Sequence, residues 1–302
     1  MNMKWALRPL ARRRFFWPGA LACLLALGAS PALADSNALR QKYGAVKEQM
    51  RHNDIDRELH IDSSEAGDAL RGDVYAVLDH SFATVREALK DPARWCDVLI
   101  LPFNTKYCHA LDSPEGASLV VRIGRKYDQP LQNAYRLDFA YRNIAARPDY
   151  FESRLNAGAG PLGTRDYRIV LAGMPVGSDQ TFVHLSYSYS YGLAGRLAMQ
   201  GYLATVGADK IGFTVTGRQP DGGPQYIGGV RGAVERNAMR YYLAVDSFLA
   251  SLSQPPAQQL DRRIQHWFSA TERYPRQLRE MDRPTYVTMK LHEVERQQSL
   301  IQ

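Results

Sequence analysis

The chain has 302 residues, of which 45% are hydrophobic and 23% charged, so it is long and apolar enough to bury a sizeable core. It carries 38 basic and 31 acidic residues, a formal net charge of +7, but five of the basic residues and no acidic ones lie in the first 34 positions. The rest of the chain, with 33 basic and 31 acidic residues, has no concentrated basic face, and we expect no nucleic-acid partner.

The first 34 residues have the features of a secretory signal peptide. A basic start is followed by a Leu- and Ala-rich run over 20–29 that is short for a membrane span, and Ala32-Leu33-Ala34 matches a small-x-small cleavage site. We expect cleavage after Ala34, and therefore a soluble periplasmic or secreted protein. Arg12 to Phe16 resembles a twin-arginine signal, although Ala11 stands where Ser or Thr is usual, so both the Sec and the twin-arginine routes stay open.

The cysteines are consistent with an oxidising compartment. Beyond the leader only Cys96 and Cys108 remain, and an even pair in an exported protein predicts a structural disulfide. It would join the end of a helix to the start of a strand. A reactive thiol pair or metal ligands are the alternatives, but the spacing differs from C-x-x-C and no His cluster accompanies it. We expect no metal and no cofactor.

The mature chain opens with helical spacing of Leu39, Tyr43, Val46 and Met50, which predicts an amphipathic helix over 37–51. Two strands (58–63 and 72–78) follow, then a helix capped by Ser81 and a second short helix after Asp91-Pro92. Turns rich in Gly, Pro, Asn and Asp then separate a run of strands, which predicts an antiparallel meander over 105–111, 118–124, 133–144, 150–156, 165–172 and 181–191. A helix over 195–209 and short strands over 211–216 and 225–228 come next.

The strand over 181–191 alternates strictly, so its odd-numbered side chains share one face. That face is apolar but carries the hydroxyls of Tyr187, Tyr189 and Tyr191, and buried tyrosines normally need a hydrogen-bond partner. Such a wall suits a cavity for a mostly apolar ligand with a few polar points. The alternative is a sheet face whose tyrosines reach water or backbone at the rim. Neighbouring strands have similar aromatic faces, which add three candidate ligand-binding residues: Tyr135, Phe139 and Tyr167.

A long helix is predicted over 230–252, with one continuous apolar stripe that includes Tyr241. Asn237 lies on the same stripe, and a buried amide must be hydrogen-bonded, either to the sheet or to a ligand. We predict that this helix forms one wall of the ligand site, with Asn237 and Tyr241 as its polar points.

Pro255 and Pro256 end the main domain, and the remaining stretch has helical patterns around Ile264, Trp267 and Phe268 and around Val287, Leu291 and Val294. We expect a helical tail packed on the domain rather than a partner-binding arm. The predicted division is a signal peptide (1–34), an N-terminal helix (35–56), a main domain (57–253) and a helical C-terminal extension (254–302).

The motif G-x-G-x-x-G occurs at Gly158 to Gly163, but a dinucleotide loop needs a helix after it. The residues that follow alternate like a strand, so we predict a hairpin loop. The chain has no G-x-S-x-G or H-E-x-x-H motif and its histidines are scattered; we expect His184, on the even face of its strand, to be a surface residue rather than a base. We therefore predict no catalytic residue.

The order of elements resembles the helix-grip fold of the START-related (SRPBCC) superfamily, whose members include lipid-transfer domains and polyketide cyclases. The resemblance covers residues 58–252 and rests on element order, on the Trp95-Cys96 helix end and on the Gly228-Gly229 entry into the last helix. It implies an α+β fold in which a curved antiparallel sheet wraps around the long C-terminal helix, with a tunnel between them for an apolar ligand.

Two functions from different classes follow from this resemblance. The first is periplasmic binding or transfer of a hydrophobic, lipid-like molecule, with transient contact to a membrane. The second is a cyclase- or hydrolase-like enzyme on the same scaffold, which would show a titratable group within hydrogen-bond reach of a second one inside the cavity. A structural envelope protein is a third reading, and a filled cavity would mark it.

Overall fold

The computed structural model describes residues 31–114, 116–205 and 207–300, and its core is one curved antiparallel sheet. Within the sheet the strands run in the order β1-β2-β8-β7-β6-β5-β4-β3. Their bounds are β1 Leu59–Ala66, β2 Ala69–Leu78, β3 Thr105–Leu111, β4 Ser118–Ile123, β5 Tyr135–Ala146, β6 Phe151–Ala159, β7 Thr164–Pro175 and β8 Thr181–Tyr191.

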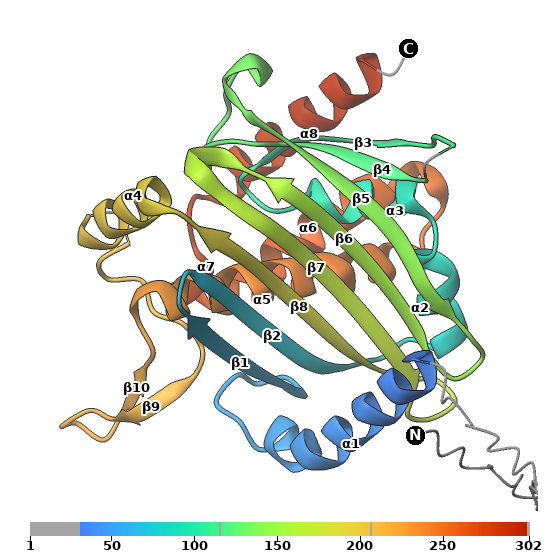
Figure 1. The fold of residues 1–302 in the computed structure, drawn as a ribbon, viewed down its shortest axis with the longest axis horizontal. Helices are drawn as coiled ribbons and strands as arrows, with labels where there is room; N and C mark the ends of the chain where they lie inside the picture. The colour runs from blue at the N-terminus through green and yellow to red at the C-terminus, as the bar shows by residue number, and fades with distance from the viewer. Residues whose placement is uncertain (1–30, 115, 206, 301–302) are drawn as a thin grey trace, which may run out of the picture.

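Helices cover both faces of this sheet (Figure 1). They are α1 Pro31–Arg51, α2 Phe82–Leu89, α3 Pro92–Leu99, α4 Leu193–Ala204, α5 Gly229–Ser251, α6 Pro256–Glu272, α7 Pro275–Leu278 and α8 Arg283–Ser299. Two single 3₁₀ turns, η1 Leu131–Asn133 and η2 Pro161–Gly163, and a separate two-stranded ribbon, β9 Val215–Arg218 and β10 Pro224–Tyr226, complete the described elements. This α+β arrangement confirms the predicted helix-grip architecture.

Local sequence explains where α2 and α3 begin. Ser81 caps α2 by accepting from the Thr84 amide, as the sequence predicted, and Asp91 caps α3 by accepting from the Ala93 amide. Helix α4 begins and ends earlier than the predicted 195–209. Helix α1 begins at Pro31, so its first four residues belong to the expected leader, and residues 1–30 of that leader lie outside the described part of the chain.

Helix α5 packs against the inner face of β1, β2 and β8. Its approach to β2 is closest at Gly72, where a Cβ atom would lie 2.9 Å from the Val234 carbonyl oxygen and 3.1 Å from Ala238 Cβ. Only glycine permits this spacing without a shift of the helix backbone. The helix axis is therefore fixed over one half of the sheet.

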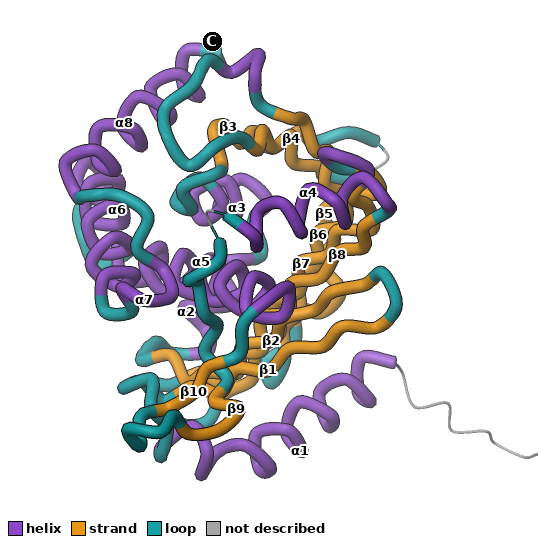
Figure 2. Tube along the Cα trace, turned by 90° about the vertical axis from the view of Figure 1, so that its left-hand side faces the viewer, coloured by secondary structure: helices purple, strands orange, loops and turns teal. Residues whose placement is uncertain are grey.

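Helix α1 lies on the opposite, outer face of the sheet from α5 (Figure 2). Its predicted apolar stripe is in contact with that face: Leu39, Val46 and Met50 are buried, and the Tyr43 ring lies 4.8 Å from that of Phe182. The sheet therefore has apolar packing on both faces, and its outer face is only partly covered by this one helix.

The C-terminal helices pack on the main domain. The Trp267 ring of α6 contacts Phe103 and Tyr286, and its Nε1 donates to the Arg240 carbonyl of α5. The buried face of α8 is offset from the predicted apolar pattern: Leu291 is 43% exposed, whereas Lys290 and Glu293 are fully buried.

Those two charged residues join α8 to β3. Glu293 accepts from Lys290 at 2.7 Å and from Lys106 of β3 at 2.8 Å. Lys290 also donates to the carbonyls of Pro102 and Thr105, so its ammonium is satisfied on several sides. Burial lowers the pKa of Lys290 to about 8, although Glu293 opposes the shift.

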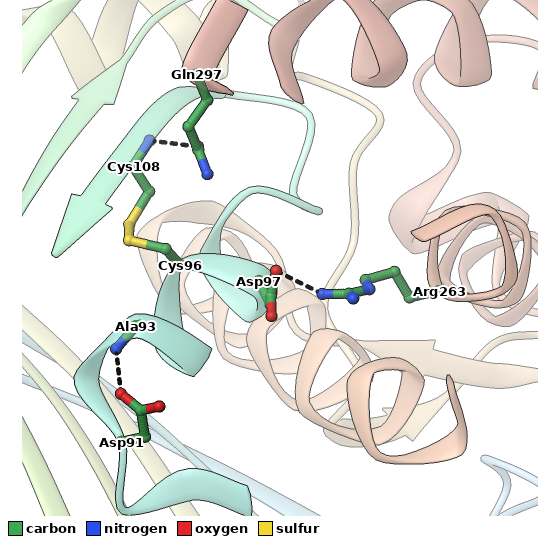
Figure 3. Close-up of a disulfide and its surroundings, with 7 residues drawn as sticks. All are labelled: Asp91, Ala93, Cys96, Asp97, Cys108, Arg263 and Gln297. Carbon is green, nitrogen blue, oxygen red and sulfur yellow. Dashed lines mark hydrogen bonds and ion pairs between the residues drawn. A yellow bond between two sulfur atoms is a disulfide. The ribbon is translucent and has the colours of Figure 1, made fainter. Parts of the chain in front are cut away.

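Cys96 at the end of α3 and Cys108 in β3 form the predicted disulfide, with Cα atoms 5.1 Å apart. Helices of the extension hold both sides of this link (Figure 3): Arg263 pairs with Asp97, and Gln297 accepts from the Cys108 amide. Among the helices that the structure describes, none combines the length and apolarity of a membrane span.

The disulfide closes a loop of 12 residues, so a double Cys96→Ser/Cys108→Ser variant should lose about 3 kcal/mol of unfolding free energy. Urea denaturation of oxidised wild type and variant measures the difference. Reductant should destabilise the wild type by the same amount and leave the variant unchanged. Equal stability of all four samples would contradict a stabilising role for the link.

Candidate functional site

A cavity with a volume of about 290 Å³ lies between the inner face of the sheet, α5, α4 and the tip of the β6–β7 hairpin. Its floor is formed by alternating inward side chains of five strands, because successive side chains of a strand point to opposite faces. The lining comprises Leu99, Asn104, Thr105, Val121, Ile123, Leu137, Phe139, Pro161, Leu162, Thr164, Tyr167, Ile169, Tyr187, Tyr189, Tyr191, Gly195, Ala198, Met199, Tyr202, Asn237 and Tyr241.

The three tyrosines of β8 form one wall of this cavity, and each is 5 to 7% exposed. Their rings meet those of the neighbouring elements: Tyr187 lies 5.2 Å from Tyr241 of α5, and Tyr189 stacks on Tyr167 of β7 at 5.4 Å. Sheet and helix therefore contact each other through aromatic rings on this side of the cavity.

The hydroxyls of these tyrosines fall into two groups. Tyr167 donates to Thr164 Oγ1 at 2.8 Å, and Tyr191 donates to Glu65 Oε1 at 3.1 Å. Among the described residues, no hydrogen bond involves the hydroxyls of Tyr187, Tyr189 or Tyr241. Three polar points thus remain on an otherwise apolar wall.

The tyrosine hydroxyls are neutral at ordinary pH. Burial raises the pKa of Tyr187, Tyr189 and Tyr241 above the usual value, because the ionised form loses its hydration. Burial and then the Glu65 carboxylate also raise the pKa of Tyr191. These groups can therefore donate and accept hydrogen bonds, but they do not exchange protons readily near neutral pH.

Asn237 and Tyr241 both reach the cavity from α5. The sequence left open whether the Asn237 amide bonds to the sheet or faces a ligand. The amide lines the cavity, and its Oδ1 accepts from Arg240 Nη1 of the same helix at 3.4 Å rather than from the sheet.

Seven of the eight predicted ligand-binding residues are brought together in this lining, and Tyr135 is not. Tyr135 pairs with Ile123, which does line the cavity, so both lie on the inner face. However, β5 begins at Tyr135, and its side chain is 51% exposed at the end of the sheet, beyond the rim. Periodicity gives the face of a strand residue but not how far the cavity extends along it.

The sequence did not predict that α4 and the β6–β7 loop close one side of the cavity. The G-x-G-x-x-G segment is a hairpin loop, as predicted, and contains η2. Leu162 at its tip lines the cavity although it is 54% exposed, and its φ of 56° lies in the left-handed region. An apolar residue inside a glycine-rich turn was the available signal. Tyr202 of α4 had no comparable signal.

His184 lies on the outer face of the sheet, away from the tyrosine wall. Its ring stacks on Tyr75 at 4.4 Å and its Nε2 lies 2.6 Å from Asp73 Oδ1. His184 and Tyr75 border a polar hollow beside α1 that is also lined by Ser186 and Lys42. Among the described residues, no group of three metal-ligating side chains is assembled.

Comparison with known proteins gives similarity at the level of the fold. No protein-family model matches the chain, and no curated protein matches its sequence. Solved structures do match, and they include a START superfamily protein from Mycobacterium smegmatis (13% identity, 45% of this chain and 88% of that chain, TM-score 0.32).

Two further structural neighbours are enzymes by their names. One is an aromatase/cyclase from Streptomyces (11% identity, 72% of this chain and 96% of that chain, TM-score 0.32). The other is norcoclaurine synthase from Thalictrum flavum in complex with dopamine and hydroxybenzaldehyde (13% identity, 51% of this chain and 85% of that chain, TM-score 0.30). By its name, one of these structural neighbours is a member of the START superfamily, which is the family that the sequence resembles.

The raised pKa of Tyr189 has a consequence for stability. Burial of the neutral hydroxyl contributes fully to the free energy of unfolding below pH 10, the approximate pKa of tyrosine in the unfolded chain. This contribution is lost as the pH rises further, because Tyr189 then ionises in the unfolded chain only. Between pH 9 and 11 the unfolding free energy of a Tyr189→Phe variant should fall by about 1 kcal/mol less than that of the wild type. Urea denaturation at both pH values tests this, and parallel losses would contradict burial of the hydroxyl.

Proposed function

We propose that this protein binds or transfers a hydrophobic, lipid-like ligand in the cavity between the sheet and α5. The observation that carries the proposal is the lining itself. It is made of aliphatic and aromatic side chains with a few hydroxyls and amides, and the described lining residues include no Asp, Glu, His, Lys, Arg or Cys. A concave apolar wall with few polar points is the usual form of a site for an apolar ligand.

The enzyme alternative requires a different arrangement. A general acid or base works best with a pKa near the operating pH, within hydrogen-bond reach of the proton that it transfers. The nearest approach to such a pair is Tyr191 with Glu65, and there the pKa of the tyrosine is moved up, away from neutrality. This favours binding over catalysis as the function of the cavity.

We also propose that the protein works outside the cytoplasm after cleavage behind Ala34. Two features support this location: the leader-like first 34 residues and the disulfide between Cys96 and Cys108. An apolar ligand crossing an aqueous compartment needs a carrier that shields it from water.

An exposed apolar surface at the cavity mouth would let the ligand enter from a membrane. Leu162, Leu193 and Leu197 are 54%, 74% and 60% exposed, and they come from the two elements that cover the cavity. Leu193 and Leu197 lie one turn apart on α4, so they share one face of that helix. We propose that this face, the α4 leucine face, makes transient membrane contact.

Native mass spectrometry of protein purified from the periplasm should show a chain that begins at Asp35 with a bound hydrophobic molecule, which extraction would release. An Ala198→Trp variant, which puts an indole into the cavity mouth, should retain the ligand about tenfold less well. Ala194→Trp on the same helix is the matched control, since Ala194 is outside the lining. Ligand-free wild type, or equal retention by both variants, would contradict the proposal.

Membrane contact predicts a second difference. Replacing both leucines of α4 (Leu193→Ser/Leu197→Ser) should weaken co-sedimentation with phospholipid vesicles about tenfold or more, because each leucine loses its favourable transfer out of water. Leu291→Ser on α8, a position 43% exposed, should leave co-sedimentation unchanged. The same loss in both variants would show that the contact is not specific to the cavity mouth.

A further inference from the structure

Four basic side chains lie behind one end of the cavity with a single carboxylate between them. Glu280, from the loop between α7 and α8, lies 2.7 Å from Lys126 Nζ, 2.5 Å from Arg240 Nη2 and 4.0 Å from Lys210 Nζ. Arg236 is 2% exposed, and among the described residues no carboxylate lies within 4.0 Å of its guanidinium. We call Lys126, Lys210, Arg236 and Arg240 the basic cluster.

The basic cluster is short of negative charge. Buried charges are costly unless they are paired and hydrogen-bonded, and here one carboxylate pairs with three of the four cations. Arg240 is 6% exposed, and its buried Nε has no hydrogen-bond acceptor. Burial, and then the charge of Arg240, lower the pKa of Lys126, which is the response of a cation in such surroundings.

Two lining residues connect the basic cluster to the cavity. Arg236 Nη2 donates to the Tyr202 hydroxyl at 3.3 Å, and Arg240 Nη1 donates to Asn237 Oδ1 at 3.4 Å. A guanidinium can only donate, so both oxygens are used as acceptors. Tyr202 and Asn237 each keep a donor for the cavity, the phenolic proton and the Nδ2 amino group, beside the remaining lone pair of each oxygen. This end of the cavity therefore offers hydrogen-bond donors.

Lys126 adds a positive charge near this donor end of the cavity. Its Nζ lies 5.8 Å from the centre of the Tyr202 ring, and its side chain is 35% exposed. Burial alone would raise the pKa of Glu280, but the charges of Arg240 and Lys126 outweigh it and the pKa is lowered. Glu280 is therefore an ionised counter-ion, supplied by the C-terminal extension, that neutralises only part of the basic cluster.

We propose that the donor end of the cavity binds the anionic head of an amphiphile, a carboxylate or a phosphate, while its apolar chain lies along the tyrosine wall. The proposal rests on the proposed function and names the ligand class. The head accepts hydrogen bonds from Asn237 Nδ2 and the Tyr202 hydroxyl, and the basic cluster behind them supplies the opposite charge. A neutral amphiphile of the same chain length lacks this attraction between opposite charges and should bind less tightly.

The test uses the full chain and three probes of equal chain length: dodecanoate, dodecyl phosphate and 1-dodecanol. Each displaces the neutral fluorescent probe N-phenyl-1-naphthylamine from the cavity. At least one anion should displace it at a concentration about tenfold lower than the alcohol does, the gain expected for charge-assisted hydrogen bonds. Comparing the two anions separates a carboxylate head from a phosphate head.

Two variants locate the effect. Lys126→Met removes one of the four charges of the basic cluster and should reduce the advantage of the preferred anion over the alcohol about threefold. Asn237→Asp places a carboxylate at the donor end with little change in shape and should abolish the advantage. Lys47→Met, on the exposed side of α1, is the matched control for the lysine variant and should behave as wild type.

The outcomes separate the two proposals. Equal displacement by all three probes, or an anion advantage that survives both variants, would overturn the anionic-head assignment and leave apolar binding intact. If neither the fluorescent probe nor any amphiphile binds to folded protein, the proposed function itself fails. A circular dichroism spectrum of each variant establishes that it is folded.

Discussion

The close approach of α5 to β2 determines where the cavity can exist. At Gly72 the helix backbone lies too near the strand for any Cβ atom, so α5 is held over β1, β2 and β8. The inner faces of β4, β5 and β7 extend beyond this contact, and their residues Val121, Phe139 and Ile169 line the cavity. Side chains that line a cavity make fewer dispersion contacts with the protein than those of a packed core, so a cavity beside so tight a contact needs a reason.

The composition of the cavity wall supplies one. Phenylalanine at the positions of Tyr187, Tyr189 and Tyr241 would give similar ring packing without hydroxyls that make no hydrogen bond to the described residues. The wall is therefore not optimised for packing alone. The basic cluster is likewise not optimised for stability, since cations that share one carboxylate lower the stability of the free protein. Both features are explained by a ligand with an apolar chain and a head that accepts hydrogen bonds.

The sequence predicted those parts of the fold that follow from local rules. Strict alternation predicted the bounds and the inward face of β8. The cap at Ser81 and the break at Asp91-Pro92 predicted where α2 and α3 begin. Cysteine number and spacing gave the disulfide. Seven residues of the cavity lining were reached in the same way, from the period of two in the strands and the stripe of the last helix.

The parts that escaped prediction depend on contacts between distant segments. Tyr135 has the correct face but is the first residue of β5 and lies past the end of the cavity, whose cover comes from α4 and the β6–β7 loop. The buried face of α8 contains Lys290 and Glu293, whose partners outside the helix are Lys106 of β3 and the carbonyls of Pro102 and Thr105. Glu280 is 154 residues from Lys126 along the chain, so no local pattern could indicate their contact.

The central claim is that a single-chain amphiphile occupies the cavity between the sheet and α5. A crystal structure of the protein with dodecanoic acid tests it most directly. The account predicts the alkyl chain against Tyr187 and Tyr241, with the carboxylate within hydrogen-bond distance of Asn237 Nδ2. Electron density for the ligand in the polar hollow beside His184 on the outer face of the sheet, with the cavity left without it, would contradict the account.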